Sequence, residues 1–140
     1  MKKIFFLGLL LSAFFISGAQ TSWSVSCSGK AVLKNATEAP QKNVLSIKRS
    51  SLKKSGNITI SFDKADSTSI RTLMADDSNR SGIKSWEDVT KPVVITNAEL
   101  KQLFTGRNTI HFYFTEIPRD PAKAALVRVR PVHLCTVSAQ

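Results

Sequence analysis

FTGRNTIHFYFTEIPRDPAKAALVRVRPVHLC, residues 104–135, carries the clearest structural pattern in the chain. Its first part alternates apolar and polar side chains, with Ile110, Phe112 and Phe114 interleaved by His111, Tyr113 and Thr115. This period of two is typical of a strand that buries one face. Residues 127–130, Val-Arg-Val-Arg, alternate in the same way and predict a second strand after a Pro-bounded loop. The pattern therefore predicts a hairpin with one apolar and one polar face.

The polar face of this hairpin is the predicted binding surface. It would carry Tyr113, Arg128 and Arg130, together with His111 if the strand register allows it. An outward aromatic residue between two arginines suits a protein interface, because Tyr and Arg are enriched among the residues that dominate binding energy. We expect these four residues to contact a protein partner or an anionic ligand.

The start of the chain has the three parts of a secretory signal peptide. Lys2 and Lys3 precede an apolar run at residues 4–16, and Ser17-Gly18-Ala19 supplies the small residues of a cleavage site. The run is too short for a membrane-spanning helix, which needs about 20 residues. We predict that residues 1–19 are a signal peptide cleaved after Ala19, that residues 20–140 form a single domain, and that the mature protein is secreted or periplasmic.

The chain is basic, with a net charge of +10 that falls to +8 once Lys2 and Lys3 are removed. A positive field of this kind attracts an anionic envelope polymer, lipid headgroups or an acidic protein. Export argues against a nucleic-acid partner, and the sequence shows no recognition helix or stacking platform. No second apolar run follows the leader, so we expect no transmembrane span in the mature chain.

Cys27 and Cys135 are the only cysteines and lie near the two ends of the mature chain. In an exported protein a single pair of cysteines predicts a disulfide bond, with two buried thiols as the alternative. The bond would join the first strand to the last. It would close a loop of about a hundred residues, which is worth up to about 4–5 kcal/mol in the chain-entropy model.

The rest of the chain reads as short strands separated by turns. Residues 69–74 form a weaker strand that we expect at a sheet edge, and residues 76–90 read as a long polar connection. Thr96 and Glu99 match a capping box, which predicts a short helix that starts at Thr96 and ends before Gly106. About seven strands and one short crossover helix predict an all-β fold, a two-sheet antiparallel β-sandwich.

Residues 103–112, Leu-Phe-Thr-Gly-Arg-Asn-Thr-Ile-His-Phe, resemble the corner of immunoglobulin-like and fibronectin-type-III-like sandwiches, where a Leu, a Gly and an alternating strand recur. The resemblance is confined to this corner and implies a fold but no function. The chain departs from that superfamily because Ile110 stands where the tyrosine corner would place a Tyr, and because its cysteines lie near the chain ends. An immunoglobulin-like and a transthyretin-like strand order both remain open.

Catalytic motifs are missing from the sequence, which contains no G-x-S-x-G, H-E-x-x-H, P-loop or Rossmann glycine pattern. We expect His111 and His133, the only histidines, to be surface residues on neighbouring strands, since a metal site needs three or four convergent ligands. Parity with Val127 and Val129 points His133 inward, so we expect a bulge at Pro131 that resets the alternation. We predict a protein without enzymatic activity, cofactor or metal.

These features together predict an exported, non-enzymatic binding or structural module of the cell envelope, in one version an accessory subunit of an envelope assembly. The alternative is a secreted or periplasmic inhibitor or immunity-type protein that blocks another protein with residues 76–90. Charge reversal at Arg128 and Arg130 should abolish partner capture under the first hypothesis. Trimming residues 76–90 should abolish activity under the second.

Overall fold

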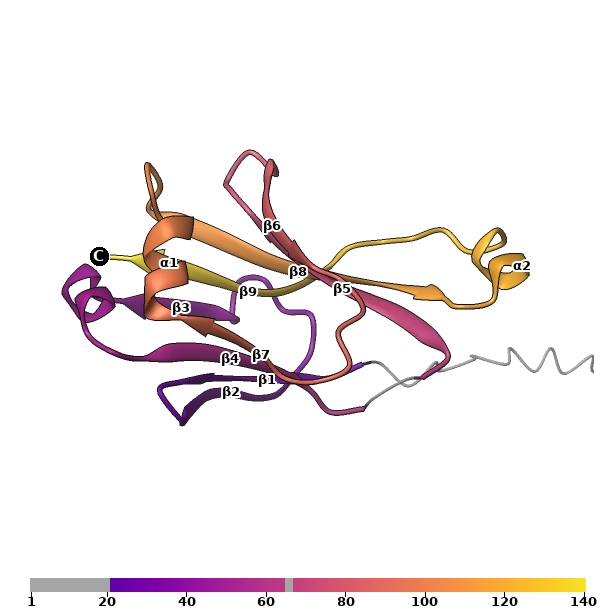
Figure 1. Cartoon of the computed structure of the whole chain (residues 1–140), viewed down its shortest axis with the longest axis horizontal. Helices are drawn as coiled ribbons and strands as arrows, with labels where there is room; N and C mark the ends of the chain where they lie inside the picture. Colours follow the sequence, from indigo (N-terminus) through magenta and orange to yellow (C-terminus); the bar gives the residue numbers. More distant parts are fainter. Residues whose placement is uncertain (1–20, 65–66) are drawn as a thin grey trace, which may run out of the picture.

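The computed structural model describes residues 21–64 and 67–140, in which nine strands form two packed sheets (Figure 1). The predicted signal peptide lies outside the described residues. The four-stranded sheet has the order β2-β1-β4-β7, and the five-stranded sheet has the order β3-β9-β8-β5-β6. The prediction of an all-β sandwich is confirmed. The strands are β1 (Trp23–Cys27), β2 (Lys30–Ala36), β3 (Val44–Ile47), β4 (Asn57–Phe62), β5 (Ser69–Asp76), β6 (Gly82–Trp86), β7 (Val93–Thr96), β8 (Thr109–Pro118) and β9 (Val132–Ala139).

The core lies between the two sheets. It is filled by the side chains that point inward at every second position along the strands. Trp23 and Val25 of β1 are fully buried, as are Ile110 and Phe112 of β8. The ring of Phe114 receives Trp23 and Phe62 edge-on, at centroid distances of 5.6 and 5.1 Å. Aromatic pairs of this geometry stabilise the fold beyond the area that they bury. The alternation at the start of the 104–135 stretch therefore places its apolar face as predicted.

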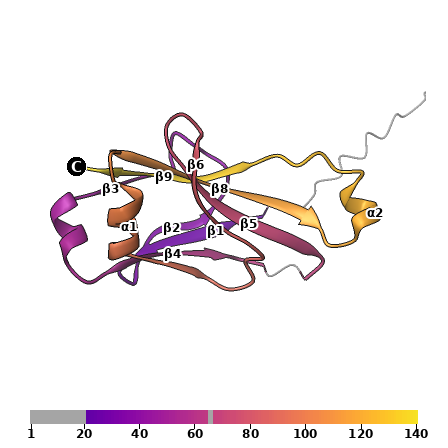
Figure 2. The same ribbon diagram turned by 45° about the horizontal axis from the view of Figure 1, so that its top comes forward.

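The short helix α1 (Asn97–Leu103) carries the chain from the four-stranded to the five-stranded sheet, as predicted. Its capping box is present: Glu99 N donates to Thr96 Oγ1 at 3.2 Å, and Thr96 N donates to Glu99 Oε2 at 3.0 Å. Gly106, with a φ of +72°, adopts the left-handed conformation that ends this connection. A second turn of helix, the 3-10 helix η1 (Arg49–Lys53), lies beside α1 at the same end of the sandwich (Figure 2).

Three features of the sheets differ from the sequence-based predictions. β3 pairs with β9 in parallel, so the sandwich is not wholly antiparallel. Residues 76–90 are not a long connection, because they contain β6, which pairs with β5. β5 itself therefore lies between β6 and β8 rather than at an edge. The physical reason is that Ile83 and Trp86 pack against the core, and two apolar side chains are enough for an edge strand with its other face in water.

The second strand of the predicted hairpin lies further along the chain. β8 pairs with β9, whereas residues 127–130 belong to no strand, and Val127 and Val129 are exposed. Leu134, Cys135 and Val137 of β9 are fully buried instead. Pro131 has no N–H for a ladder hydrogen bond, which favours a strand that starts after it. Residues 119–131, called the 119–131 projection below, extend beyond the sandwich and include the short helix α2 (Pro121–Ala124) (Figure 1).

Cys27 and Cys135 lie on β1 and β9, in opposite sheets. Burial and the neighbouring Cys27 raise the pKa of Cys135 to about 12, and burial also raises the pKa of Cys27. Both are free thiols here, so the predicted disulfide bond is not part of this structure. The two layers are nevertheless joined at this point, because Trp23 Nε1 donates to the Leu134 carbonyl at 3.2 Å. None of the helices described is long and apolar enough to cross a membrane.

Candidate binding surface

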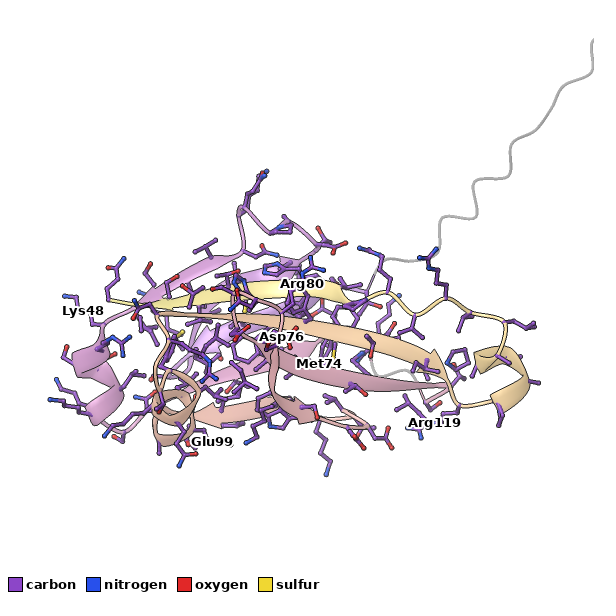
Figure 3. The ribbon with its side chains drawn as sticks, turned by 90° about the horizontal axis from the view of Figure 1, so that it is seen from above. Lys48, Met74, Asp76, Arg80, Glu99 and Arg119 are labelled. Carbon is purple, nitrogen blue, oxygen red and sulfur yellow. The ribbon has the colours of Figure 1, made fainter. Side chains whose placement is uncertain are left out.

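The outer face of the five-stranded sheet carries an open depression of about 580 Å³. Its floor is formed by His111 and Tyr113 of β8 with His133 and Thr136 of β9. Three charged residues from outside these strands line its rim; they are Glu38, Arg80 and Arg130. We call these seven residues the outer-face depression. Figure 3 looks onto this face and shows Arg80 near the middle of the molecule, between Lys48 at one end and Arg119 toward the other.

A bulge in β9 brings the two histidines to the same face. Phe112 pairs with Cys135 and Tyr113 pairs with His133, so Leu134 has no partner in β8. An extra residue of this kind shifts the alternation of the strand by one. Leu134 and Cys135 are therefore both buried, while His133 joins Thr136 on the outer face. The reset of alternation that the sequence required does occur, but at Leu134 and not at Pro131.

Thr136 connects the two imidazole rings through its hydroxyl. Its Oγ1 lies 2.9 Å from His111 Nδ1 and 2.9 Å from His133 Nε2. The hydroxyl has one proton to donate, so at least one ring must donate its own N–H to the oxygen. The assignment that leaves neither a buried ring N–H nor the Thr136 hydroxyl without an acceptor has His133 Nε2–H donating to Thr136, and Thr136 donating to His111. His111 Nε2–H is then available to a ligand.

His133 is held in its neutral form by its surroundings. Its side chain is only 5% exposed, and its Nδ1 is buried without a hydrogen-bond partner among the residues described. Burial lowers the pKa of His133, the charge of His111 lowers it further, and Glu38 opposes both effects. A proton on Nδ1 would create a buried donor with no acceptor, which is costly. The depression therefore has a rigid, uncharged ring at its base.

The aromatic floor is continuous across β8 and β9. The Tyr113 and His133 ring centroids lie 5.3 Å apart and meet edge-on, and His111 lies 6.5 Å from Tyr113 and 6.2 Å from His133. These rings offer an apolar surface with polar edges, the combination found where proteins bind one another.

Glu38 fixes one side of the rim. It accepts from Arg130 Nη1 at 3.1 Å and Nη2 at 2.7 Å, and from the His133 backbone N–H at 3.2 Å. The hydrogen bonds from Arg130 lower the pKa of Glu38, and Glu38 in turn raises the pKa of Arg130. This two-pronged pair neutralises the Arg130 charge and attaches the segment before β3 to the segment before β9.

Arg80 supplies the cation on the opposite side of the rim. It lies in the turn between β5 and β6 with a φ of +60°. Asp77 holds this turn, because its Oδ1 accepts from Asn79 N at 2.8 Å and from Ser81 N at 2.9 Å. Within the described residues the Arg80 side chain has no acidic partner. Its charge is therefore available to a ligand, unlike that of Arg130.

Three of the four predicted binding residues meet in the depression, namely His111, Tyr113 and Arg130. Arg128 does not join them, because it lies in the 119–131 projection and not on the strand where the sequence placed it. Sequence reasoning missed Glu38, Arg80, Thr136 and the contribution of His133. The need to reset the parity of β9 was the one signal for His133 and Thr136. Glu38 and Arg80 lie in connecting segments, for which strand periodicity gives no orientation.

No group of three or more His, Cys, Asp or Glu side chains converges within residues 21–64 and 67–140 in a way that could hold a metal ion. Among the seven residues of the outer-face depression, Arg80, His111 and Tyr113 have side-chain donors that no other described residue engages. Comparison of the chain with protein-family models, with curated proteins and with solved structures finds no match.

Proposed function

We propose that this protein is an exported, non-enzymatic binding module of the cell envelope. The outer-face depression is its binding surface, and its ligand is an acidic side chain of a partner protein together with the apolar residues next to it. The observation that carries this proposal is the unpaired Arg80 beside a floor of three aromatic rings. A guanidinium binds a carboxylate through two parallel hydrogen bonds, and the rings accept the apolar surroundings of that carboxylate.

The geometry favours binding over catalysis. Thr136 lies between two imidazoles, which resembles the start of a nucleophile–base pair. A catalytic imidazole also needs a third group to orient it, and the carboxylate that lines the depression, Glu38, is engaged by Arg130 and a backbone N–H. The neutral, buried His133 serves better as a floor than as a base.

The test is site-specific photocrosslinking in the native host. A photoreactive phenylalanine analogue at position 113 should give one discrete adduct with a partner, because the Tyr113 ring faces the ligand. The same analogue at Val94, an exposed position on the other sheet, should not give that adduct. Arg80→Glu should abolish the adduct at position 113 through charge repulsion.

Lys34→Glu is the matched control for Arg80→Glu. It makes the same change in net charge on β2, in the opposite sheet. The adduct should persist in this variant. Equal loss in both variants would assign the capture to overall charge, and the same adduct from Val94 would remove the depression as the binding surface.

The inhibitor hypothesis has a smaller structural basis than the sequence suggested, since residues 82–86 form the strand β6. The part that still projects is the turn at residues 77–81, which stands out from the sheet with β6 in Figure 1 and carries Arg80. Replacing this turn by Asn-Gly should abolish inhibition of a target if that function holds. Under the binding-module hypothesis, Arg80→Glu alone should already have the full effect.

A further inference from the structure

The 119–131 projection gathers apolar side chains in water. Six large apolar residues are exposed among the residues described, and three of them lie within four consecutive positions of the projection. Leu126 is 86% exposed, Val127 44% and Val129 41%. A surface normally scatters such residues singly, so a cluster at one tip points to a binding role.

The base of the projection is fixed to the sandwich, so its tip is held in place. On one side Arg119 forms an ion pair with Asp88 and donates from Nε to the Ser67 carbonyl at 3.1 Å. On the other side Arg130 pairs with Glu38. Asp120 caps α2 by accepting from Ala122 N at 2.9 Å. The projection lies at the end of the molecule opposite α1 (Figure 1).

The charge of the tip is positive and unpaired. Lys123 precedes the apolar residues and Arg128 lies among them. Neither has an ion pair within the described part of the chain. The one acid of residues 119–131, Asp120, is engaged as the α2 cap. None of the five pockets described is lined by residues 119–129, so these pockets offer no site for a small ligand at the tip.

We propose that the 119–131 projection binds an anionic lipid bilayer. Leu126 and Val127 enter the boundary between headgroups and acyl chains, and Lys123 and Arg128 contact headgroup phosphates. Apolar insertion and attraction to anionic lipid are each weak alone and become effective together. The inference goes beyond the proposed function, since the four side chains that carry it line no part of the depression and the two sites share no ligand.

The experiment measures sedimentation with vesicles of phosphatidylcholine alone or with an equal part of phosphatidylglycerol, at low salt. It uses the chain from Gln20 onward, which contains every core residue and lacks the apolar run that would bind vesicles by itself. Binding is expected to the anionic vesicles only. The double variant Lys123→Ala with Arg128→Ala should lower the affinity for anionic vesicles about 25-fold, because each cation contributes a factor of about five.

Two matched controls identify the surface. Lys53→Ala with Lys54→Ala removes the same charge at the η1 end of the sandwich, and should change the affinity much less. Leu126→Ser should weaken binding by about tenfold, because one large side chain no longer inserts. Val94→Ser, an exposed apolar position on the other sheet, should leave it unchanged.

Insertion has its own readout. In the Leu126→Trp variant, anionic vesicles should shift the tryptophan emission to shorter wavelength. The parent chain, which has only Trp23 and Trp86, should show a smaller shift. No sedimentation with anionic vesicles, unchanged emission, or equal loss from the Lys53 and Lys54 variant would each overturn the proposal. Arg80 and Tyr113 are unaltered in all these variants, so crosslinking at position 113 can succeed or fail independently.

Discussion

Thr136 holds both imidazoles of the outer-face depression with one hydroxyl. Thr136→Val keeps the shape of the side chain and removes both hydrogen bonds. We expect the free energy of unfolding to fall by about 1–2 kcal/mol, since each such bond contributes about 1 kcal/mol. Urea denaturation measures the change. Thr115→Val on β8 is the control and should cost less than about 0.5 kcal/mol; equal losses would show that Thr136 has no special part in the depression.

His133 makes stability depend on pH. Its pKa in the folded protein lies below the ordinary value of 6.5, so the unfolded chain takes up the proton first as the pH falls. This contribution to stability is complete above about pH 6.5 and is lost progressively below it. Urea denaturation between pH 8 and pH 5 should show the loss, and His133→Gln should flatten it. This pH range stays above 4.5, the ordinary pKa of Glu38. The pKa of Glu38 is itself lowered in the folded protein, so Glu38 stays ionised over the range. An unchanged slope in the variant would contradict the assignment.

Arg71 is a charged residue at an inward position of β5, 6% exposed. Its Nε donates to Glu116 Oε1 at 2.7 Å, and its guanidinium lies 4.2 Å from the Phe62 ring centroid. Arg71→Met should lower the free energy of unfolding by about 3 kcal/mol, because Glu116 loses its partner. Glu116→Gln in the same chain should restore part of this loss in a urea denaturation series. An additive double variant would show that the pair is not coupled.

At the scale of elements, β9 shows why the strands were only partly predictable. Residues 127–130 alternate as regularly as residues 135–139, so local periodicity cannot choose between them. The choice depends on register against β8, which buries Leu134, Cys135 and Val137. The parallel pairing of β3 with β9 is likewise a property of the whole sheet. In contrast, α1 was predictable because its capping box is a local contact.

Limited proteolysis with trypsin tests the two corrected elements. Lys84 lies on β6, hydrogen-bonded to β5, whereas Lys123 and Arg128 lie in the projection outside any sheet. Proteases cut exposed segments that open at low cost. We therefore expect trypsin to cut first after Lys123 or Arg128. Mass spectrometry of the fragments identifies the first cleavage site. First cleavage after Lys84 would support the long connection that the sequence suggested.

For the whole molecule, the floor of the depression was more predictable than its rim. Strand parity placed His111 and Tyr113 together, because residues two apart on a strand share a face. Glu38 lies 92 positions before Arg130, and Arg80 reaches the depression only because β6 folds back along β5. Such contacts depend on how the two sheets close, which no local pattern contains. For the same reason, local periodicity did not predict that Arg128 lies in the 119–131 projection.

Cys27 and Cys135 give a test of how the two sheets are joined. Export remains a prediction; in an oxidising compartment we expect these thiols, near enough for one to raise the pKa of the other, to form a bond between β1 and β9. Protein recovered without reductant and then unfolded should not react with iodoacetamide. Reduction should lower the free energy of unfolding by up to about 4–5 kcal/mol, since the loop is long. Cys27→Ser, unable to form the bond, should be insensitive to reductant.

In the reduced folded protein Cys135 should resist alkylation, because a pKa of about 12 leaves almost no thiolate. Two alkylated cysteines in the unreduced, unfolded protein would mean that packing alone joins the layers.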